Sequence, residues 1–352
     1  MAAAADSADV FAVSKAGRAL AFASSFTICL LAAGVLAITL FGRPAAPAIT
    51  LELGDMPGRQ GAAIPSGPTL SDNITAAAPV TQPIYAGKAL LADPALIENS
   101  PSGPLPRIAD DGRKPMTAYA APAGANAKFK IAVVVSGLGV SASATKAALA
   151  NLPAGVTLGF APYAGDVGEW VSQARGRGHE VLLQIPMEPF DFPDSDPGPY
   201  TLRAGQDEAA NIQRLTWALS RFTGYAGVTN LLGQRFLSDS SALSPTLTYL
   251  NRRGLYFFDN GAAAQSVAPT VAAQVGIPAV QSNTSVDGIQ TALEIDRRLS
   301  ELETQARTSG SAVGSAFLYP VSIARIAAWA KGLQARGFVL VPVSAIVTQP
   351  KQ

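Results

Sequence analysis

From Phe129 onward, short apolar runs alternate with longer amphipathic stretches, and this alternation limits the possible folds more than any other feature. The runs are IAVVV (131–135), VTLGF (156–160), VLLQI (181–185), YAGV (225–228), LYFF (255–258), PAVQ (278–281), AVGSAF (312–317) and FVLVPV (338–343). Helical patterns lie between them near 141–150, 166–177, 207–222, 239–253, 264–275, 287–309 and 321–335. Strands that alternate with helices form parallel sheets. About 220 residues in this pattern predict an α/β domain over 129–348, with a barrel or barrel-like sheet.

Glycine placement agrees with this phasing. Left-handed residues often end a helix, and glycine adopts that conformation without steric cost. Glycines fall just after an expected helix and before an expected strand at Gly178, Gly254, Gly276, Gly310 and Gly337.

The N-terminal part of the chain has a different character. Residues 20–41 read LAFASSFTICLLAAGVLAITLF, without charge or proline, which is about the length of a membrane-spanning helix. We expect a single transmembrane helix here, and Lys15 and Arg18 favour a cytoplasmic location for residues 1–19. A cleavable signal peptide is the alternative, although its apolar core usually has only about 7–15 residues. The pattern predicts a single-pass protein of the bacterial inner membrane, with its C-terminal domain in the periplasm.

Residues 42–128 are rich in proline, alanine and glycine and hold 13 of the 26 prolines. No helical or alternating period persists there, which predicts a disordered or extended linker with room for short contacts around 84–97. The only cysteine, Cys29, lies in the apolar segment, so the exported part has no thiolate nucleophile or ligand. A net charge of +1 without a basic block argues against nucleic acid as a partner.

Ligands of β/α domains bind at the carboxyl ends of the strands. The only histidine, His179, precedes a strand and therefore falls on the opposite face, where capping or packing of a turn is its expected role. A serine–histidine triad and a histidine-rich zinc site are both disfavoured, since each needs histidine beside the reacting atom.

Six segments, in this order, resemble the divergent polysaccharide deacetylases, relatives of the NodB-type carbohydrate esterases. They are VVVSGLGV, LPAGVTLGFAPYA, GHEVLLQIPMEP followed by DPGPYTL, GVTNLLGQRF, RRGLYFFDN and RGFVLVPVSAI, within residues 130–347. The resemblance implies a distorted (β/α) barrel and a saccharide partner, such as an envelope glycan or a peptidoglycan-type saccharide. It also implies a divalent metal such as zinc, which would polarise the acyl carbonyl and activate water.

The positions that carry the metal and catalytic groups in that family hold other residues here. The replacements are Ser136 and Gly137 for two aspartates, Gln184 and Leu231 for histidines, Ser282 and Asn283 for an Arg-Asp pair, and Phe317 for a late histidine, while Asp287 is retained. Zinc needs about three protein ligands, commonly histidine and carboxylate. We therefore expect neither a metal site nor another cofactor.

The remaining polar residues allow two interpretations. Glu188, Asp259 and Asp287 are candidates for acid and base catalysis, as in glycosidases. Alternatively, Asp259 caps the next helix, Asp287 begins the 287–309 helix and Glu188 holds its loop. The candidate saccharide-binding residues are Ser136, Tyr163, Gln184, Asn230, Arg235 and Tyr319, although aromatic residues there equally fit loop packing. Asp191, Asp194 and Asp196 are interpreted as turn residues rather than as a calcium loop.

Three functions remain open from the sequence. The first is an anchored envelope protein whose deacetylase-like barrel binds or senses a glycan, with hydrolysis lost or weakened. The second is an active carbohydrate esterase or other hydrolase that uses the remaining carboxylates. The third is a module that docks another envelope protein, and fold alone does not decide among the three.

Overall fold

The computed structural model describes residues 92–123 and 128–347. The expected membrane span at 20–41 and the cytoplasmic segment at 1–19 lie outside these residues. Within the described ranges, no helix has the length and apolar character needed to cross a membrane.

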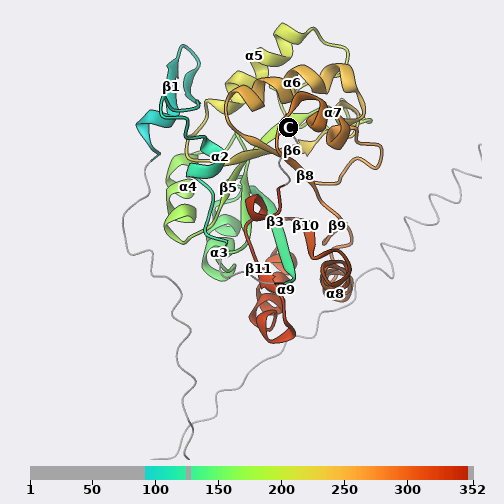
Figure 1. Cartoon of the computed structure of the whole chain (residues 1–352). Helices are drawn as coiled ribbons and strands as arrows, with labels where there is room; N and C mark the ends of the chain where they lie inside the picture. Colours follow the sequence, from blue (N-terminus) through green and yellow to red (C-terminus); the bar gives the residue numbers. More distant parts are fainter. Residues whose placement is uncertain (1–91, 124–127, 348–352) are drawn as a thin grey trace, which may run out of the picture. The chain divides into compact units, whose positions relative to one another are not determined.

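A nine-stranded sheet forms the centre of the domain (Figure 1). Its strands are β3 (Lys130–Leu138), β4 (Thr157–Phe160), β5 (Val181–Met187), β6 (Gly227–Leu232), β7 (Tyr256–Asp259), β8 (Ala279–Gln281), β9 (Thr284–Ser285), β10 (Ser311–Phe317) and β11 (Val339–Leu340). The order is β8-β7-β6-β5-β4-β3-β10-β9, with β11 paired to β3 beside this path. Every pairing in this sheet is parallel, which confirms the predicted α/β class.

Residues 279–285 connect the two ends of the sheet. β8 pairs with β7, and β9, which follows after residues 282 and 283, pairs with β10. Between them, the Ser282 amide donates to the Asp259 carbonyl at 2.8 Å and the Asn283 amide donates to the Val313 carbonyl at 2.8 Å. The sheet therefore curls into the distorted (β/α) barrel that the resemblance implies.

Helices surround the sheet (Figure 1), and seven of those in the described chain follow its strands. They are α3 (Ala142–Asn151), α4 (Val167–Gly176), α5 (Glu208–Leu219), α6 (Ser240–Arg252), α7 (Ala268–Val275), α8 (Ala292–Ser309) and α9 (Pro320–Lys331). All seven overlap the helical ranges expected from the sequence, although α8 begins five residues later than expected. The five glycines expected between helices and strands have φ between +71° and +88°.

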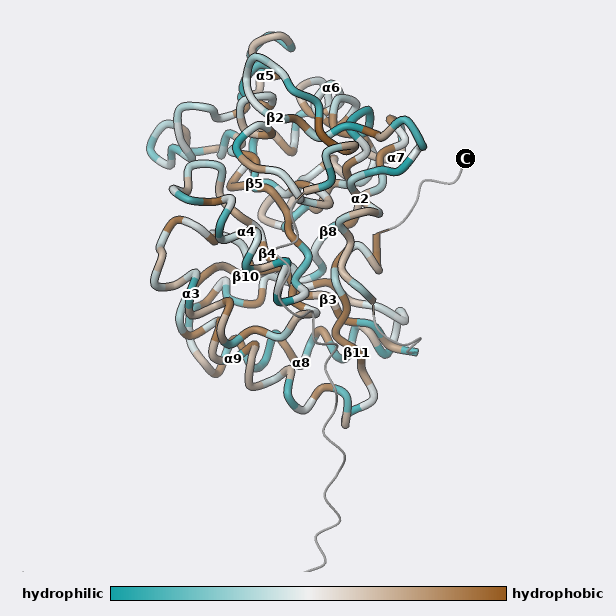
Figure 2. The backbone as a smooth tube through the Cα atoms, turned by 90° about the vertical axis from the view of Figure 1, so that its left-hand side faces the viewer, coloured by the Kyte–Doolittle hydropathy of each residue, from teal (hydrophilic) through white to brown (hydrophobic). Residues whose placement is uncertain are grey.

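Alternation along the strands gives the barrel two cores, because neighbouring side chains point to opposite faces. Ile131, Val133 and Val135 pack with residues of the surrounding helices. Ala132 and Val134 pack on the other side, in a cluster that includes Leu182, Tyr256, Phe258 and Val313. Figure 2 shows the hydrophobic colouring along β3 and β5.

Residues before the barrel are ordered over part of the expected linker. The 3-10 helix η1 (Pro94–Leu96), the antiparallel strands β1 (Ile97–Ser100) and β2 (Gly103–Pro106), and the short helix α2 (Pro115–Ala118) precede β3. The linker prediction is therefore wrong for 92–123. Prolines are compatible with this structure because Pro94 and Pro115 stand at helix starts, where no amide donor is needed. The buried side chains of Leu96, Leu105 and Met116 hold the segment on the domain.

A buried carboxylate joins this segment to the 3-10 helix η4 (Val343–Ala345) at the amino ends of the strands. Glu180, which precedes β5, accepts hydrogen bonds from the amides of Ala121 (3.1 Å) and Ser344 (3.0 Å), the Tyr256 hydroxyl (2.8 Å) and the Ser344 hydroxyl. Its neighbour His179 is also buried, and the His179 Nδ1 atom lies 2.9 Å from the Val156 carbonyl. Burial lowers the pKa of His179 and raises that of Glu180. The contacts of Glu180 and His179 therefore indicate that both residues stabilise the fold at this end of the barrel.

Candidate functional site

A cavity of about 170 Å³ lies at the carboxyl ends of the strands, where the sequence predicts the ligand site. Three hydroxyl groups, two amides and one carboxyl group line it, together with apolar side chains. The lining residues are Ser136, Gln184, Leu231, Leu232, Asn260, Ala262, Ser285, Asp287, Ser315, Ala316 and Phe317. Three of the predicted site residues, Ser136, Gln184 and Asp287, are brought together here.

Ser136 and Gln184 occupy neighbouring places at the inner side of the barrel. β4 leaves room for them because it has a glycine, Gly159, beside them. A Cβ atom at Gly159 would lie 2.9 Å from the Ser136 hydroxyl and 3.5 Å from the Gln184 Cγ atom. Gln184 Oε1 accepts a hydrogen bond from the Gly137 amide at 2.8 Å. Within the described residues, no hydrogen bond uses the Gln184 Nε2 atom or the hydroxyls of Ser136 and Ser285. These groups are available to a ligand.

Asp287 is the one carboxylate that lines this cavity. Its Oδ2 atom accepts hydrogen bonds from the Phe317 amide and the Ser322 hydroxyl, both at 2.7 Å. No hydrogen bond from another described residue reaches Oδ1. Burial raises the pKa of Asp287. The interpretation of Asp287 as a helix start is wrong, because α8 begins at Ala292 and Thr291 caps it.

The ring of Phe317 covers the position where the family carries its second aspartate. Gly137 has φ +91°, and a Cβ atom there would lie 2.6, 2.8 and 3.0 Å from three ring atoms of Phe317. Phe317 is the residue that the resemblance matches to the family's late histidine, and it is 37% exposed. Its ring occupies the space into which a side chain at position 137 would extend.

Asn230 supports the cavity from behind. It is fully buried, and its Nδ2 atom donates to the Leu232 carbonyl (2.7 Å) and to Asn260 Oδ1 (2.8 Å). The Asn260 amide in turn donates to Asn230 Oδ1 at 3.0 Å. Asn230 is therefore placed to position Asn260, which lines the cavity, and it is not itself part of the lining.

Glu188 and Asp259 lie in other surroundings, so the three candidate carboxylates do not form one set. Glu188 accepts hydrogen bonds from the Ala204 amide (2.7 Å) and from Arg235 Nη1 (3.2 Å), consistent with holding its loop. Asp259 is 1% exposed and lines a different cavity. It accepts from the Gly261 amide at 2.9 Å, whereas α7 begins only at Ala268. The interpretation of Asp259 as a helix cap is therefore wrong.

The predicted tyrosines differ in their environment. The Tyr163 ring lies 5.3 Å from that of Trp217, which stacks on Tyr200 at 3.6 Å, and the Tyr163 hydroxyl accepts from the Tyr200 amide at 3.3 Å. Burial raises the pKa of Tyr163, whose side chain is 39% exposed. Tyr319 lies with its ring 5.4 Å from that of Phe317, beside the cavity.

The residues at the cavity do not fit a divalent metal. Among the described residues, no group of three or more histidine, cysteine, aspartate or glutamate side chains is arranged to hold one. Asp191 and Asp196 are engaged in turn contacts: Asp191 accepts from the Ser195 hydroxyl at 2.6 Å, and Asp196 accepts from the Gly198 amide at 2.8 Å. No catalytic step through a metal can be derived from this side-chain set.

Asn260, Ser285 and Ser315 also line the cavity, although none of them is among the candidate catalytic or saccharide-binding residues named from the sequence. A signal for Ser315 existed in the run SAVGSAF (311–317), because the period of two places it on the same face as Val313. The Ser315 hydroxyl donates to the Asn260 carbonyl at 2.7 Å, which joins β10 to the loop after β7.

Comparisons with known proteins agree with this architecture. The family model described as divergent polysaccharide deacetylase matches residues 133–347. The uncharacterized protein ATU2773 from Agrobacterium tumefaciens C58 has a crystal structure that is 42% identical, with a TM-score of 0.68, over 70% of this chain and 100% of that one. The uncharacterized protein YibQ of Escherichia coli K12 is 22% identical over 63% of this chain and 68% of its own length.

An uncharacterized protein of Haemophilus influenzae is 24% identical over 43% of this chain, and the match spans about half of that protein, 52%. The family match covers more than half of the 352 residues and all nine strands of the barrel sheet apart from the first residues of β3. The chain therefore belongs to the divergent polysaccharide deacetylase family.

Proposed function

We propose that this chain is a membrane-anchored envelope protein whose barrel binds a neutral glycan, with the metal-dependent hydrolysis of its family lost or weakened. The observation that carries the proposal is the strand-end cavity, which is lined by Ser136, Gln184 and Leu231, the residues that the resemblance matches to family ligands. The cavity thus has a polar lining without a metal-binding set.

The chemistry of the cavity favours a sugar over an anionic ligand. No basic side chain is among its lining residues, whereas hydroxyl and amide groups are available for hydrogen bonds. Leu231 and Phe317 supply apolar surface beside these groups, and sugars present both hydroxyl groups and apolar ring faces. A volume of about 170 Å³ is smaller than the roughly 300–1,000 Å³ of sites for drug-sized ligands. One sugar unit or acyl group would enter, with the rest of the chain across the rim.

The rim of the barrel supports the same proposal. The exposed large apolar residues of the described chain lie in loops that follow strands, at the last residue of β10 or at the start of α8: Val140, Tyr163, Phe190, Ile289, Leu293 and Phe317. Of these, Phe317 lines the cavity, and an exposed apolar group beside a cavity can contact a ligand or partner.

Binding can be tested by calorimetry on the purified full chain with chitotetraose, cellotetraose and solubilised peptidoglycan fragments. We expect saturable binding of at least one acetamido sugar. The change Ser136→Ala should weaken it about fivefold through loss of one hydrogen bond. Ser300→Ala, on the exposed surface of α8, is the matched control and should leave affinity unchanged. Absence of binding across the panel would overturn the glycan proposal.

Loss of hydrolysis has a separate test. The full chain is dialysed against trace zinc, manganese or cobalt, its metal content is measured, and acetate release from acetylated chito-oligosaccharides is followed. We expect no tightly held metal and no release above the buffer rate. If one equivalent of bound metal and acetate release are both found, the proposal of a binding protein is wrong and the chain is an active esterase.

The membrane anchor is tested by fractionation of cells. Residues 20–41 have the length and composition of one spanning helix. The full chain is expected to stay in the membrane pellet after alkaline carbonate washing, and a chain without residues 20–41 is expected to leave it. If the carbonate wash releases the full chain, the proposal that the protein is anchored in the membrane is wrong.

A second candidate function, metal-independent hydrolysis, is favoured by Asp287. A buried carboxyl with a raised pKa, lining a cavity, has the character of an acid–base catalyst. If hydrolysis of a glycan or its ester is detected without metal, Asp287→Asn should abolish it while the protein stays folded. Unchanged activity in that variant would exclude Asp287 from the reaction.

A further inference from the structure

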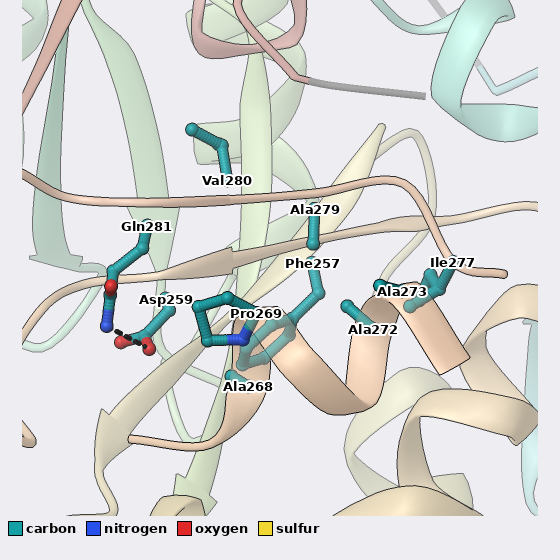
Figure 3. Close-up of a pocket in the computed structure, with 10 residues that line it drawn as sticks. All are labelled: Phe257, Asp259, Ala268, Pro269, Ala272, Ala273, Ile277, Ala279, Val280 and Gln281. Atoms are coloured by element: carbon teal, nitrogen blue, oxygen red, sulfur yellow. Dashed lines mark hydrogen bonds between the residues drawn. The ribbon is translucent and has the colours of Figure 1, made fainter. Parts of the chain in front are cut away.

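A second cavity of about 420 Å³ lies beside α7, apart from the strand-end cavity, and the two share no lining residue. Figure 3 shows its lining, which is apolar except at one end, where Asp259 and Gln281 lie together. The apolar lining consists of Phe257, Ala268, Pro269, Ala272, Ala273, Ile277, Ala279 and Val280.

The order of elements explains why this cavity exists. Each earlier strand of the barrel, from β3 to β7, is followed by a helix, but β8 is followed by β9 after residues 282 and 283. Within the described chain, no helix of this connection covers the outer side of β8, whose three residues are all partly exposed. The α7 residues that face the gap are alanines and a proline, which are too small to fill it.

The polar end contains a buried acid without a basic partner. Asp259 is 1% exposed, and its two hydrogen bonds come from neutral donors, the Gly261 amide and Gln281 Nε2, each at 2.9 Å. None of the ion pairs among the described residues includes Asp259. A carboxylate can accept about four hydrogen bonds. Two of these are used within the described chain, so the Asp259 carboxyl group keeps acceptor capacity for a positively charged donor.

We infer that the cavity beside α7 binds an apolar organic cation, with an ammonium group against Asp259 and Gln281 and a hydrocarbon body along α7 and β8. The volume lies within the roughly 300–1,000 Å³ of small-molecule sites, and such sites are largely apolar with a few polar groups that orient the ligand. Gln281 donates to Asp259 through Nε2, which leaves its Oε1 atom to accept a hydrogen bond from the same ammonium. This site does not depend on glycan binding at the strand ends.

The test compares three probes of similar shape that differ in the charge of the head group: 2-phenylethylamine, 2-phenylethanol and 3-phenylpropionate. Each is titrated into the full chain at neutral pH and followed by calorimetry. The amine should bind saturably, at least about tenfold more tightly than the alcohol, and the carboxylate should not bind. Equal affinity for all three, or no amine binding, would overturn the inference.

Two variants locate the binding. Asp259→Asn should remove the preference for amine over alcohol, because the charge is lost while the hydrogen-bonding shape is kept. Ala273→Leu adds a side chain at an exposed position of α7 that lines the cavity, so it should weaken every probe about tenfold or more without disturbing the core. Ala328→Leu on the exposed side of α9 is the matched control. Amine binding that persists in both cavity variants would place the ligand elsewhere and refute the site.

Discussion

Replacing Gly137 with alanine should destabilise the barrel by about 2–4 kcal/mol, because two costs combine. Gly137 has φ +91°, a conformation that costs a residue with a side chain about 1–3 kcal/mol. The new Cβ atom would also lie 2.6 Å from the nearest ring atom of Phe317, and overpacking of this kind costs about 1–3 kcal/mol. The ring is 37% exposed and can move toward solvent, which keeps the sum below the upper limit of the two ranges.

A double-mutant cycle separates these costs. Urea unfolding is measured for the wild type, Gly137→Ala, Phe317→Ala and the double variant. In the Phe317→Ala background the steric conflict is gone, so Gly137→Ala should cost only the backbone strain of about 1–3 kcal/mol. Gly165→Ala is the control, since a Cβ atom at Gly165 meets no atom within 4 Å. The reasoning fails if Gly137→Ala costs the same in both backgrounds or behaves like the control.

Three further predictions concern buried titratable groups. Burial lowers the pKa of His179. The contribution of neutral His179 to the free energy of unfolding is therefore fully present above the ordinary pKa of 6.5 and is lost as pH falls through the lowered pKa. The urea midpoint should drop on acidification, and it should drop less in His179→Gln. Glu180 serves four donors, and Glu180→Gln, which keeps one acceptor oxygen, should cost about 1–3 kcal/mol of unfolding free energy at its pH optimum. Burial raises the pKa of Asp287 above 3.8, so the contribution of its protonated form to the free energy of unfolding is lost as pH rises through the raised pKa. At neutral pH the urea midpoint of Asp287→Asn should therefore equal or exceed that of the wild type. A markedly lower midpoint in the variant would contradict this reasoning.

Periodicity was sufficient to predict the barrel because the strands and helices differ sharply in length and apolar pattern. The expected helix at 239–253 is observed as Ser240–Arg252, and the one at 166–177 as Val167–Gly176. The 287–309 helix begins five residues late, at Ala292. The start of this helix could have been predicted from Thr291 and Glu294, because a threonine three residues before a glutamate is typical of a helix N-terminus. In the structure the Thr291 hydroxyl accepts a hydrogen bond from the Glu294 amide at 3.3 Å.

The site was only partly predictable because the strands of a barrel are buried on both faces. The sequence FFDN places Asp259 at a strand end but does not say which face of the strand is the inner one. In the structure Phe258 belongs to the inner cluster and Phe257 to the outer one, so Asp259 follows Phe257 to the outer side, away from Asp287. The prediction that Ser136 and Gln184 share one site was correct, because the family resemblance indicated that both side chains point to the inner face of the barrel, which the apolar pattern alone could not indicate.

The replacements at the strand-end cavity depend on one another physically. An aspartate at position 137 would need both a left-handed backbone and the space that the Phe317 ring now fills, and the Gly137 amide is already bonded to Gln184. A polar group restored at one of these positions would therefore meet an apolar ring or lose an established hydrogen bond. Since Gly137 is hydrogen-bonded to Gln184 and lies against the Phe317 ring, building a metal-binding set at these positions would require several changes together.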